Sequence, residues 1–310
     1  MRIIRCYASS APPLKGAVIA LGNFDGVHRG HQSLMQQTCA IAKKMGAPSA
    51  VLTFEPHPVS VLKKDIPPFR LTPFHLKASL LKDLGIDILY VCRFNEALSK
   101  MTAPDFITEL LIKKLGAKHL VTGDNFIFGH KRSGSTTLIE SLSSSLGFGY
   151  TKMQNVEDAG ISVSSTGIRQ SLSTGKPEVA AQLLGRNHMI EGRVVTGAQR
   201  GRELGFPTAN LRLKSHFRPL YGAYVVQVQV EGDAAWHPAV ASLGINPMFK
   251  LDAPVLEAHI FDWNRNIYGK FLRIQLLSFL RPEQKFESVP ALTQQMELDC
   301  QNAKRFFNKK

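Results

Sequence analysis

The sequence has no long apolar run, no paired cysteines and no extended basic stretch. Its apolar runs are far shorter than the roughly 20 residues that a membrane-spanning helix needs, and the start, MRIIRCYASS, lacks the apolar core of a signal peptide. The four cysteines, Cys6, Cys39, Cys92 and Cys300, are far apart and form no CxxC pair. These absences predict a cytoplasmic protein with unpaired thiols and no membrane association.

Acidic residues are few relative to basic ones. The chain has 38 Lys+Arg against 24 Asp+Glu, a formal net charge of +14. Such an excess fits a nucleic-acid-binding protein, and it equally fits an enzyme that gathers several phosphorylated substrates. The basic residues are scattered, and the one short run, Asn308, Lys309 and Lys310, is typical of a frayed end. Charge alone leaves both classes open.

The length of 310 residues predicts about two domains, and 44% hydrophobic with 20% charged residues is typical of a globular protein. In the first part, strand-like and helix-like segments alternate, which indicates a parallel α/β sheet. We expect strands at residues 18–21, 49–54, 87–92 and 119–123, and helices at 28–44, 73–84, 104–115 and 177–184, with residues 141–149 finishing another helix.

After Gly185 the pattern changes to short alternating strands separated by turns. We expect these strands at residues 190–195, 222–230, 238–243, 256–263 and 271–277, followed by a closing helix at 290–307. This spacing is typical of an all-β barrel. We therefore place the boundary near Arg186, which divides the chain into residues 1–185 and 186–310.

The segment AVIALGNFDGVHRGH, residues 17–31, predicts a strand, a tight turn and the start of a helix. The first N–H groups of a helix lack intrahelical partners and carry positive dipole charge, so this junction is a ready anion site. His28 and His31 are three apart and share one helix face, while Gly22, Gly26 and Gly30 leave room for a ligand. The pattern favours a polyphosphate site over two surface histidines.

A second polar segment, VSSTGIR, begins another predicted helix. Ser164, Ser165 and Thr166 offer hydroxyls and an N-cap, and Arg169 lies one turn further on, where it can reach the same anion.

The segment GAQRGRELGFPTANL, residues 197–211, lies between the first barrel strands. Its glycines, with Arg200 and Arg202, make a flexible basic loop suited to covering phosphates. Thr208 and Asn210 alternate to one face of an extended strand, and both present oxygens, which are the ligands that Mg²⁺ accepts.

A carboxylate within an apolar strand is costly unless it is paired or used. Glu257, in VLEAHIFDW, is such a carboxylate, and the transfer of a γ-phosphate to a hydroxyl needs a positioned base. Asp262, five residues on, points to the other side of an undistorted strand and is the lesser candidate. A structural ion pair of Glu257 with Arg273 or Lys270 is the competing interpretation.

Together, GNFDGVHRGHQ, VSSTGIR and GFPTAN resemble the motifs of prokaryotic bifunctional riboflavin kinase/FMN adenylyltransferases, in the order of that family. The resemblance covers the chain from about Gly16 to Phe307. It implies a Rossmann-like nucleotidylyltransferase domain at residues 1–185 and a riboflavin kinase β-barrel with a closing helix at 186–310. It implies that riboflavin is phosphorylated to FMN, and that FMN is then adenylylated to FAD with release of pyrophosphate.

The resemblance also implies roles for particular residues. The catalytic set is Glu257, His28, His31 and Arg169. ATP for adenylylation is bound by Gly22, Asn23, Phe24, Asp25, His28, His31, Ser164, Ser165, Thr166 and Arg169. Flavin at that site is bound by Phe54, His57, Asn125, Phe126, Phe128 and Arg132, with core packing as the competing interpretation of Phe126 and Phe128. ATP for the kinase is bound by Gly197, Arg200, Gly201, Arg202, Gly205, Pro207, Thr208 and Asn210, and Thr208 and Asn210 bind the metal.

The implied cofactor is Mg²⁺ with ATP as co-substrate, and the implied partners are riboflavin, FMN and FAD, without nucleic acid or membrane. We expect a monomer or weak homo-oligomer. Ile127, Ser135 and Met248 depart from the family pattern. The departures at Ile127 and Ser135 keep open a riboflavin kinase whose first domain is inactive, and Met248 concerns the binding role of its own loop in the second domain. The basic nucleic-acid-binding protein on the same scaffold is the other alternative.

Overall fold

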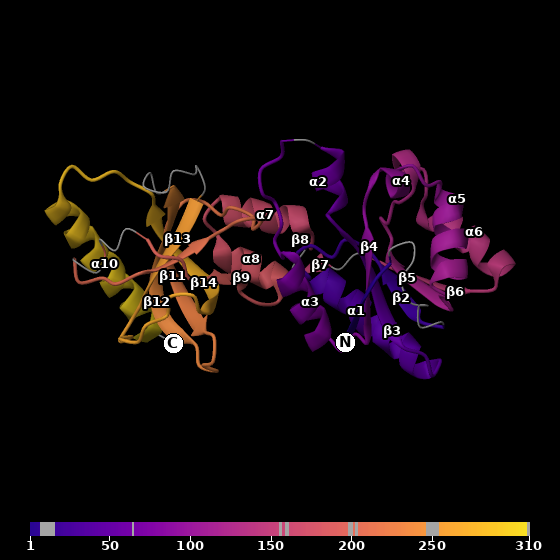
Figure 1. The fold of residues 1–310 in the computed structure, drawn as a ribbon, viewed down its shortest axis with the longest axis horizontal. Coiled ribbons are helices and arrows are strands. Elements are labelled where there is room, and N and C mark those ends of the chain that lie inside the picture. Colours follow the sequence, from indigo (N-terminus) through magenta and orange to yellow (C-terminus); the bar gives the residue numbers. More distant parts are fainter. Residues whose placement is uncertain are drawn as a thin grey trace. The chain divides into compact units, whose positions relative to one another are not determined.

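The computed structural model describes residues 1–6, 16–63, 65–154, 157–158, 161–197, 201, 204–245 and 254–308. The chain forms two compact units (Figure 1). The first consists of Met1–Pro67 and Pro73–Val163, and the second of Pro68–Thr72 and Ser164–Lys310. The sequence predicts the boundary near Arg186, where the pattern changes to barrel strands, and this domain boundary stays a prediction.

The first unit is built on a six-stranded sheet in the order β1-β4-β3-β2-β5-β6, in which every neighbouring pair is parallel. The strands are β1 Arg2–Arg5, β2 Val18–Leu21, β3 Ser49–Glu55, β4 Ile88–Arg93, β5 His119–Gly123 and β6 Gly149–Met153. The inner strand β2 is buried throughout, with Ile19 in one apolar cluster and Val18 in another. Burial on both faces explains the continuous apolar run that the sequence has here.

Helices cover this sheet. They are α1 Arg29–Lys44, α2 Pro58–Leu62, α3 Phe74–Asp83, α4 Glu96–Ser99, α5 Ala103–Asp105 and α6 Thr136–Leu146. After α5 the chain continues as a π-helix, Phe106–Lys114, where the sequence predicts an ordinary helix. A 3₁₀ turn, His130–Arg132, and the two-residue strands β7 Glu157–Asp158 and β8 Ile161–Ser162 complete the unit. Helix α6 ends at Leu146 because Gly147 is left-handed, with φ 69°, so residues 147–149 do not continue the predicted helix.

The strand order reverses at β2. From β2 the chain proceeds to β3 and β4 on one side, and then returns to β5 on the other side. In open parallel sheets, ligands bind outside the carboxyl ends of the strands at such a switch point. The turn that follows β2 and the loop that follows β5 leave the sheet there.

The second unit begins with two helices, α7 Ser165–Ser173 and α8 Pro177–Leu184, and continues into an antiparallel barrel. The barrel strands are β9 His188–Arg193, β10 Ala209–Arg212, β11 Gly222–Val230, β12 His237–Ile245, β13 Pro254–Ile260 and β14 Phe271–Pro282. Their order is β10-β13-β12-β11-β14-β9, and a bridge between Val195 and Asn210 nearly closes the barrel. The predicted fold class, α/β followed by a β-barrel, is confirmed.

The barrel has apolar side chains on its inside and a helix on its outside. Val226 and Val228 of β11 lie in the interior cluster, whereas Val225 joins the cluster beneath α10, Val289–Asn308. This helix is the predicted closing helix, and it packs against β11 and β12. Helix α8 packs against β9 and β14.

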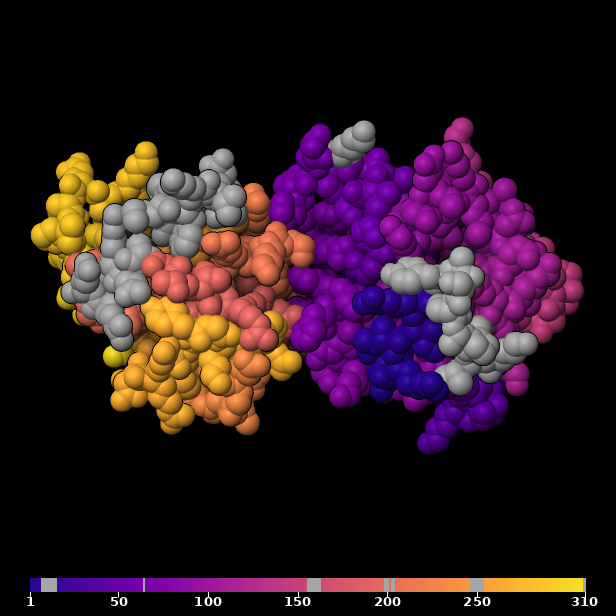
Figure 2. Space-filling model, viewed as in Figure 1, coloured from indigo at the N-terminus to yellow at the C-terminus, as the bar shows by residue number. Residues whose placement is uncertain are grey.

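Strand β1 lies at an edge of the first sheet, and three of its four residues are exposed. Figure 2 shows the indigo start of the chain on the surface.

No helix of the described residues is long and apolar enough to cross a membrane.

Candidate active sites

The turn after β2 has a strained backbone. Phe24, Gly26 and Val27 have φ values of 51°, 91° and 44°. A positive φ is a genuine outlier for a β-branched residue such as Val27, and strain of this kind is concentrated at ligand sites. Gly22 permits this turn, because a Cβ there would lie 2.8 Å from the ring of Phe24. Gln32 supports the turn by donating to the Val27 carbonyl at 2.9 Å.

The two histidines lie where the sequence predicts, at the start of α1. The Nδ1 of His28 accepts the His31 N–H at 3.4 Å, so the neutral His28 ring carries its proton on Nε2. The rings of His28 and His31 are stacked with centroids 3.6 Å apart, and Phe24 meets His31 edge-on at 5.2 Å. The stack fixes both imidazoles at the helix N-terminus, where an anion is favoured.

Two predicted flavin-site residues lie at the carboxyl end of β3 and just after it, next to β2. Phe54 is partly buried and contacts Phe94 and Phe106. His57 is the N-cap of α2, and its Nδ1 accepts the Val59 N–H at 3.2 Å. Its backbone is extended, as the flanking prolines predict.

Other predicted flavin-site residues follow β5. Phe128 is buried in the apolar core, and Phe126 is partly buried and stacked on it with centroids 5.4 Å apart. Asn125 and Arg132 are exposed, and Arg132 is left-handed with φ 62°. Packing therefore accounts for Phe128, while Asn125, Phe126 and Arg132 keep surface available for a ligand.

Two residues that the sequence reasoning missed lie under the β2 turn. Lys77 of α3 donates to the Asn23 carbonyl at 2.8 Å and to the Thr53 hydroxyl at 3.3 Å. Thr53 of β3 also donates to the Asn23 carbonyl, at 3.2 Å. Their sequence context, a lysine in an ordinary amphipathic helix and a threonine in a buried strand, gave no signal.

The VSSTGIR segment forms the predicted helix start. Ser164 is the N-cap of α7, and its hydroxyl accepts the Gly167 N–H at 3.1 Å. Arg169 donates to the Phe69 carbonyl at 3.4 Å. These residues, with Ser165 and Thr166, belong to the second compact unit, whereas the histidines belong to the first. Their part in a common site stays a prediction.

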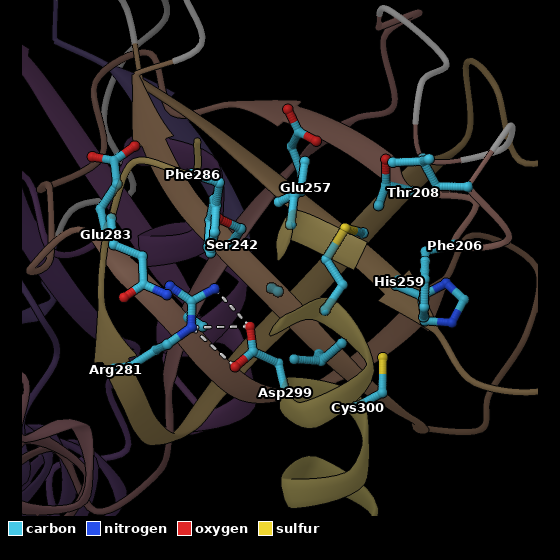
Figure 3. A pocket seen from close by; sticks show the side chains of 18 of the residues that line it. Phe206, Thr208, Ser242, Glu257, His259, Arg281, Glu283, Phe286, Asp299 and Cys300 are labelled. Carbon is cyan, nitrogen blue, oxygen red and sulfur yellow. Dashed lines mark hydrogen bonds and ion pairs between the residues drawn. The ribbon is translucent and has the colours of Figure 1, made fainter. Parts of the chain in front are cut away.

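A cavity of about 340 Å³ lies between the outer face of the barrel and α10, and we call it the large cavity (Figure 3). Thr208, just before β10, and Glu257 and His259 of β13 line one side, and α10 supplies Asp299 and Cys300 from the other. Phe206, Phe286, Leu292 and Met296 add apolar walls. The cavity thus combines apolar walls with a carboxylate and a hydroxyl.

Glu257 lies at the centre of these polar groups. On β13 it is paired directly with Asn210 of β10 and with Ser242 of β12. Its neighbours Leu256 and Ala258 point into the barrel, so Glu257 faces the large cavity. Arg273, its alternative ion-pair partner from the sequence, donates to Gln229 instead. Asp262 lies beyond the end of β13 with φ 55°.

A second cavity of about 250 Å³, the small cavity, adjoins the first through shared residues. Thr208 and Asn210 line both cavities, as their predicted common face requires. The small cavity is also lined by Gly197, Pro207, Trp263, Arg265 and Tyr268. A Cβ on Gly197 would lie 2.7 Å from the Asn210 side chain, so this glycine lets the carboxamide fit.

An ion pair fixes the helical wall of the large cavity. Arg281 of β14 donates through Nη2 to Asp299 Oδ2 at 2.7 Å and through Nε to Oδ1 at 3.0 Å (Figure 3). Gln295 donates to the same carboxylate at 2.9 Å. Burial raises the pKa of the neighbouring Cys300 thiol to about 11, so this cysteine is protonated at neutral pH.

The remaining predicted residues belong to loops. Gly201 lines the large cavity, and its carbonyl accepts the Phe206 N–H at 2.6 Å. Gly205 is left-handed with φ 84°, as its turn requires. Arg200, Arg202 and Met248 lie outside the described residues.

Comparison with known proteins finds two family models along the chain. Residues 10–167 match the family model for FAD synthetase, and residues 184–307 match the one for riboflavin kinase. The chain is 37% identical to the bifunctional riboflavin kinase/FMN adenylyltransferase of Escherichia coli (strain K12), over 99% of this chain and 98% of that protein. It is 39% identical to the enzyme of that name from Listeria monocytogenes, over 94% and 93%.

A crystal structure described as a macrolide-efflux protein from Streptococcus pneumoniae is 31% identical, with a TM-score of 0.85 over 98% of this chain and 99% of that one. That description applies to the pneumococcal protein, and the similarity here is one of fold. The full-length identity and the two domain matches, in the order that the motifs predict, show that this chain belongs to the bifunctional riboflavin kinase/FMN adenylyltransferase family.

Proposed function

We propose that this protein makes FAD from riboflavin in two ATP-dependent steps. Residues 186–310 phosphorylate riboflavin to FMN, and residues 1–185 transfer AMP to FMN, which yields FAD and pyrophosphate. Family membership supports both reactions. The observation that carries the kinase assignment is the pair Thr208 and Asn210, which line two adjoining cavities beside Glu257.

The chemistry of the two cavities supports an assignment of substrates. The isoalloxazine of riboflavin is flat and apolar, and it fits the large cavity between Phe206, Phe286 and the α10 residues Leu292 and Met296. ATP fits the small cavity, where Trp263 and Tyr268 offer aromatic faces to adenine and Arg265 offers charge to phosphate. The γ-phosphate then meets the ribityl hydroxyl at Thr208 and Asn210.

Thr208 and Asn210 also fit a magnesium ion. Mg²⁺ prefers oxygen ligands and usually retains several waters when it binds with substrate phosphates. The Asn210 side chain is 5% exposed and already oriented, since its Nδ2 donates to the Thr208 carbonyl at 3.4 Å. Its Oδ1 and the Thr208 hydroxyl are therefore the ligands that we assign. When bound, Mg²⁺ would neutralise phosphate charge during transfer.

Glu257 is assigned as the general base of the kinase. It faces the large cavity and is directly opposite Asn210, so the carboxylate lies next to the proposed phosphate position. There it accepts the proton of the attacking ribityl hydroxyl as the new P–O bond forms, while the bond between the γ-phosphorus and the β–γ bridging oxygen breaks and ADP leaves.

Adenylyl transfer has a different requirement. The FMN phosphate has a second pKa near 6, so the nucleophile is already ionised at neutral pH. Catalysis then depends on aligning this phosphate with the α-phosphate of ATP and on neutralising charge. Three groups of the first domain can align the phosphates and neutralise their charge. They are the turn formed by Gly22, Asn23, Phe24 and Asp25, the N-terminus of α1, and the Nε2–H of His28, whose ring is stacked on that of His31.

We assign the other predicted residues of adenylyl transfer by their chemistry. We assign Ser164, Ser165, Thr166 and Arg169 to the ATP phosphates, where an N-cap and a guanidinium suit an anion. We assign Phe54, His57, Asn125, Phe126 and Arg132 to the flavin side, and Phe128 supports the ring of Phe126 from the core. The position of the loops after β3 and β5, on either side of the switch point, supports this assignment.

We also infer that the enzyme acts in the cytoplasm as a monomer or weak homo-oligomer, and that neither nucleic acid nor membrane is its partner. Four free cysteines support a reducing compartment. The excess of basic residues is then explained by five phosphorylated substrates and products: ATP, ADP, FMN, FAD and pyrophosphate.

Turnover of flavins tests the whole proposal. The full chain is incubated with riboflavin, ATP and MgCl₂, and separately with FMN and ATP, and the flavins are separated by chromatography. We expect FMN and FAD in the first reaction, FAD in the second, and neither product with excess EDTA. FMN alone would leave a riboflavin kinase with an inactive first domain, whereas salt-dependent oligonucleotide binding without flavin turnover would favour the nucleic-acid-binding alternative.

A further inference from the structure

Lys77 is a buried lysine whose ammonium group lies beneath the turn that follows β2. Its side chain is 2% exposed. The Nζ donates to the Asn23 carbonyl at 2.8 Å and to the Thr53 hydroxyl at 3.3 Å, and it lies 3.9 Å from Oε1 of Glu55. Since Thr53 also donates to the Asn23 carbonyl at 3.2 Å, one backbone oxygen of the turn accepts two hydrogen bonds.

The fold does not need a charge at this position. Lys77 is on the buried side of α3 together with Leu76, Ala78 and Leu81, where an apolar side chain would pack without desolvating an ammonium group. Replacing a buried ion pair by apolar residues of similar volume is often neutral or stabilising. A lysine here is therefore better explained by what it holds than by packing.

What it holds is the first residue of the strained turn. Asn23 precedes Phe24, and Phe24 and Val27 both have positive φ values. Backbone of this kind persists only when surrounding contacts fix it. The bond from Lys77 to the Asn23 carbonyl fixes the turn from below, while the bond from Gln32 to the Val27 carbonyl fixes it from the α1 side.

We propose that Lys77 is a positioning residue for adenylyl transfer, which holds the turn so that its N–H groups and His28 are aimed at the phosphates of ATP before the nucleotide binds. This inference rests on the proposed function of the first domain. Lys77 acts through the Asn23 carbonyl and does not contact the substrate. Its loss therefore weakens the binding of ATP more than that of FMN, and it leaves the kinase reaction in the other domain unchanged.

The experiment measures both reactions of the full chain carrying Lys77→Met, which keeps length and apolar packing but removes charge and donors. With FMN and ATP we expect KM for ATP to rise about 10- to 100-fold, the range that one hydrogen bond to a charged group supplies. We expect KM for FMN and the rate of riboflavin phosphorylation to change less than about twofold. Lys82→Met, on the exposed side of the same helix, is the matched control.

A second variant removes the other donor to the same carbonyl. Thr53→Val keeps the shape of the side chain and loses its hydroxyl, and we expect a smaller rise in KM for ATP, about threefold to tenfold. It tests the inference by itself if Lys77→Met does not fold. A Lys77→Met enzyme with wild-type KM for ATP, equal rises in both KM values, or an unchanged Thr53→Val enzyme would overturn the inference. A wild-type protein that makes no FAD would instead overturn the proposed function.

Discussion

The two domains bind the same nucleotide with different kinds of surface. In the first, the candidate site is mainly backbone, a strained turn and a helix N-terminus at the switch point of a parallel sheet. In the second, it is mainly side chains, Thr208, Asn210 and Glu257, on the outer face of a barrel. The difference follows the nucleophile, because a phosphate is already ionised whereas an alcohol needs a base.

This contrast is sharpest at Glu257. In Glu257→Gln the side chain keeps its shape and loses its basicity, so we expect riboflavin phosphorylation to fall about 10²- to 10⁴-fold while adenylylation of supplied FMN is unchanged. Asp262→Asn is the control, because Asp262 lies beyond the strand and asparagine tolerates its positive φ. Rates of both reactions and the thermal midpoint check this. Normal kinase turnover in Glu257→Gln would make Asp262 the next candidate.

The reverse selectivity is expected at the histidines. His28→Ala and His31→Ala should each lower FAD formation about 10²- to 10³-fold, the effect of losing one preorganised donor, and leave FMN formation intact. Because His28 also caps α1, His28→Asn is the informative companion: asparagine is a good N-cap but places no donor at Nε2. Equal loss of both activities in a folded variant would contradict the two-site assignment.

Lowering the pH should reduce the stability of the barrel domain more than that of the first domain. Burial lowers the pKa of His188 to about 3, with help from the nearby His216 and Arg186 charges, and burial lowers that of His216 to about 4. The unfolded chain binds protons below about 6.5 and the folded barrel does not, so each histidine removes up to about 1.4 kcal/mol of barrel stability per pH unit as pH falls from 6.5 toward 4.

Thermal unfolding between pH 7.5 and 5 measures this effect. We expect the thermal midpoint of the wild-type barrel to fall steeply as the pH is lowered. In His216→Gln, whose side chain can still donate to the Glu191 carbonyl, we expect the midpoint to fall about half as steeply with pH. The same slope in His216→Gln as in the wild type would show that another group controls the acid response.

The smallest effect concerns the domain boundary. A fragment of residues 186–310 should phosphorylate riboflavin, but it lacks α8, whose Leu183 and Leu184 are buried against the rest of the second unit. We expect a fragment of residues 164–310 to have the same kinase rate and a thermal midpoint higher by about 5 °C. Equal thermal midpoints of the two fragments would show that α8 does not stabilise the barrel.

Sequence reasoning predicted the architecture well because the hydrophobic period changes from helix and buried-strand patterns to strict alternation at the barrel. It missed β1 because an exposed edge strand of four residues, two of them arginine, has no buried face. It missed α2, which begins at Pro58 after a capping histidine, because the prolines indicated only a loop. A π-helix at Phe106–Lys114 has no sequence signal that differs from an α-helix.

The candidate sites were predictable where a motif is local. His28 with His31, and Thr208 with Asn210, belong to short motifs that resemble those of the family, so the sequence marks them as candidates. Lys77 was not, because its contacts with Asn23 and Thr53 depend on tertiary packing of α3. The ion pair of Arg281 with Asp299 also joins separate elements, so neither residue carries a local sign of its role.

The position of α10 has a consequence for synthesis of the protein. The large cavity takes residues from Gly201 onward on the barrel and up to Cys300 on α10, which ends at Asn308. A ribosome that adds about 5–20 residues per second completes all six barrel strands before it releases this helix. Under the proposed assignment of riboflavin to this cavity, the newly made barrel therefore lacks the α10 wall of the flavin site until α10 has been translated.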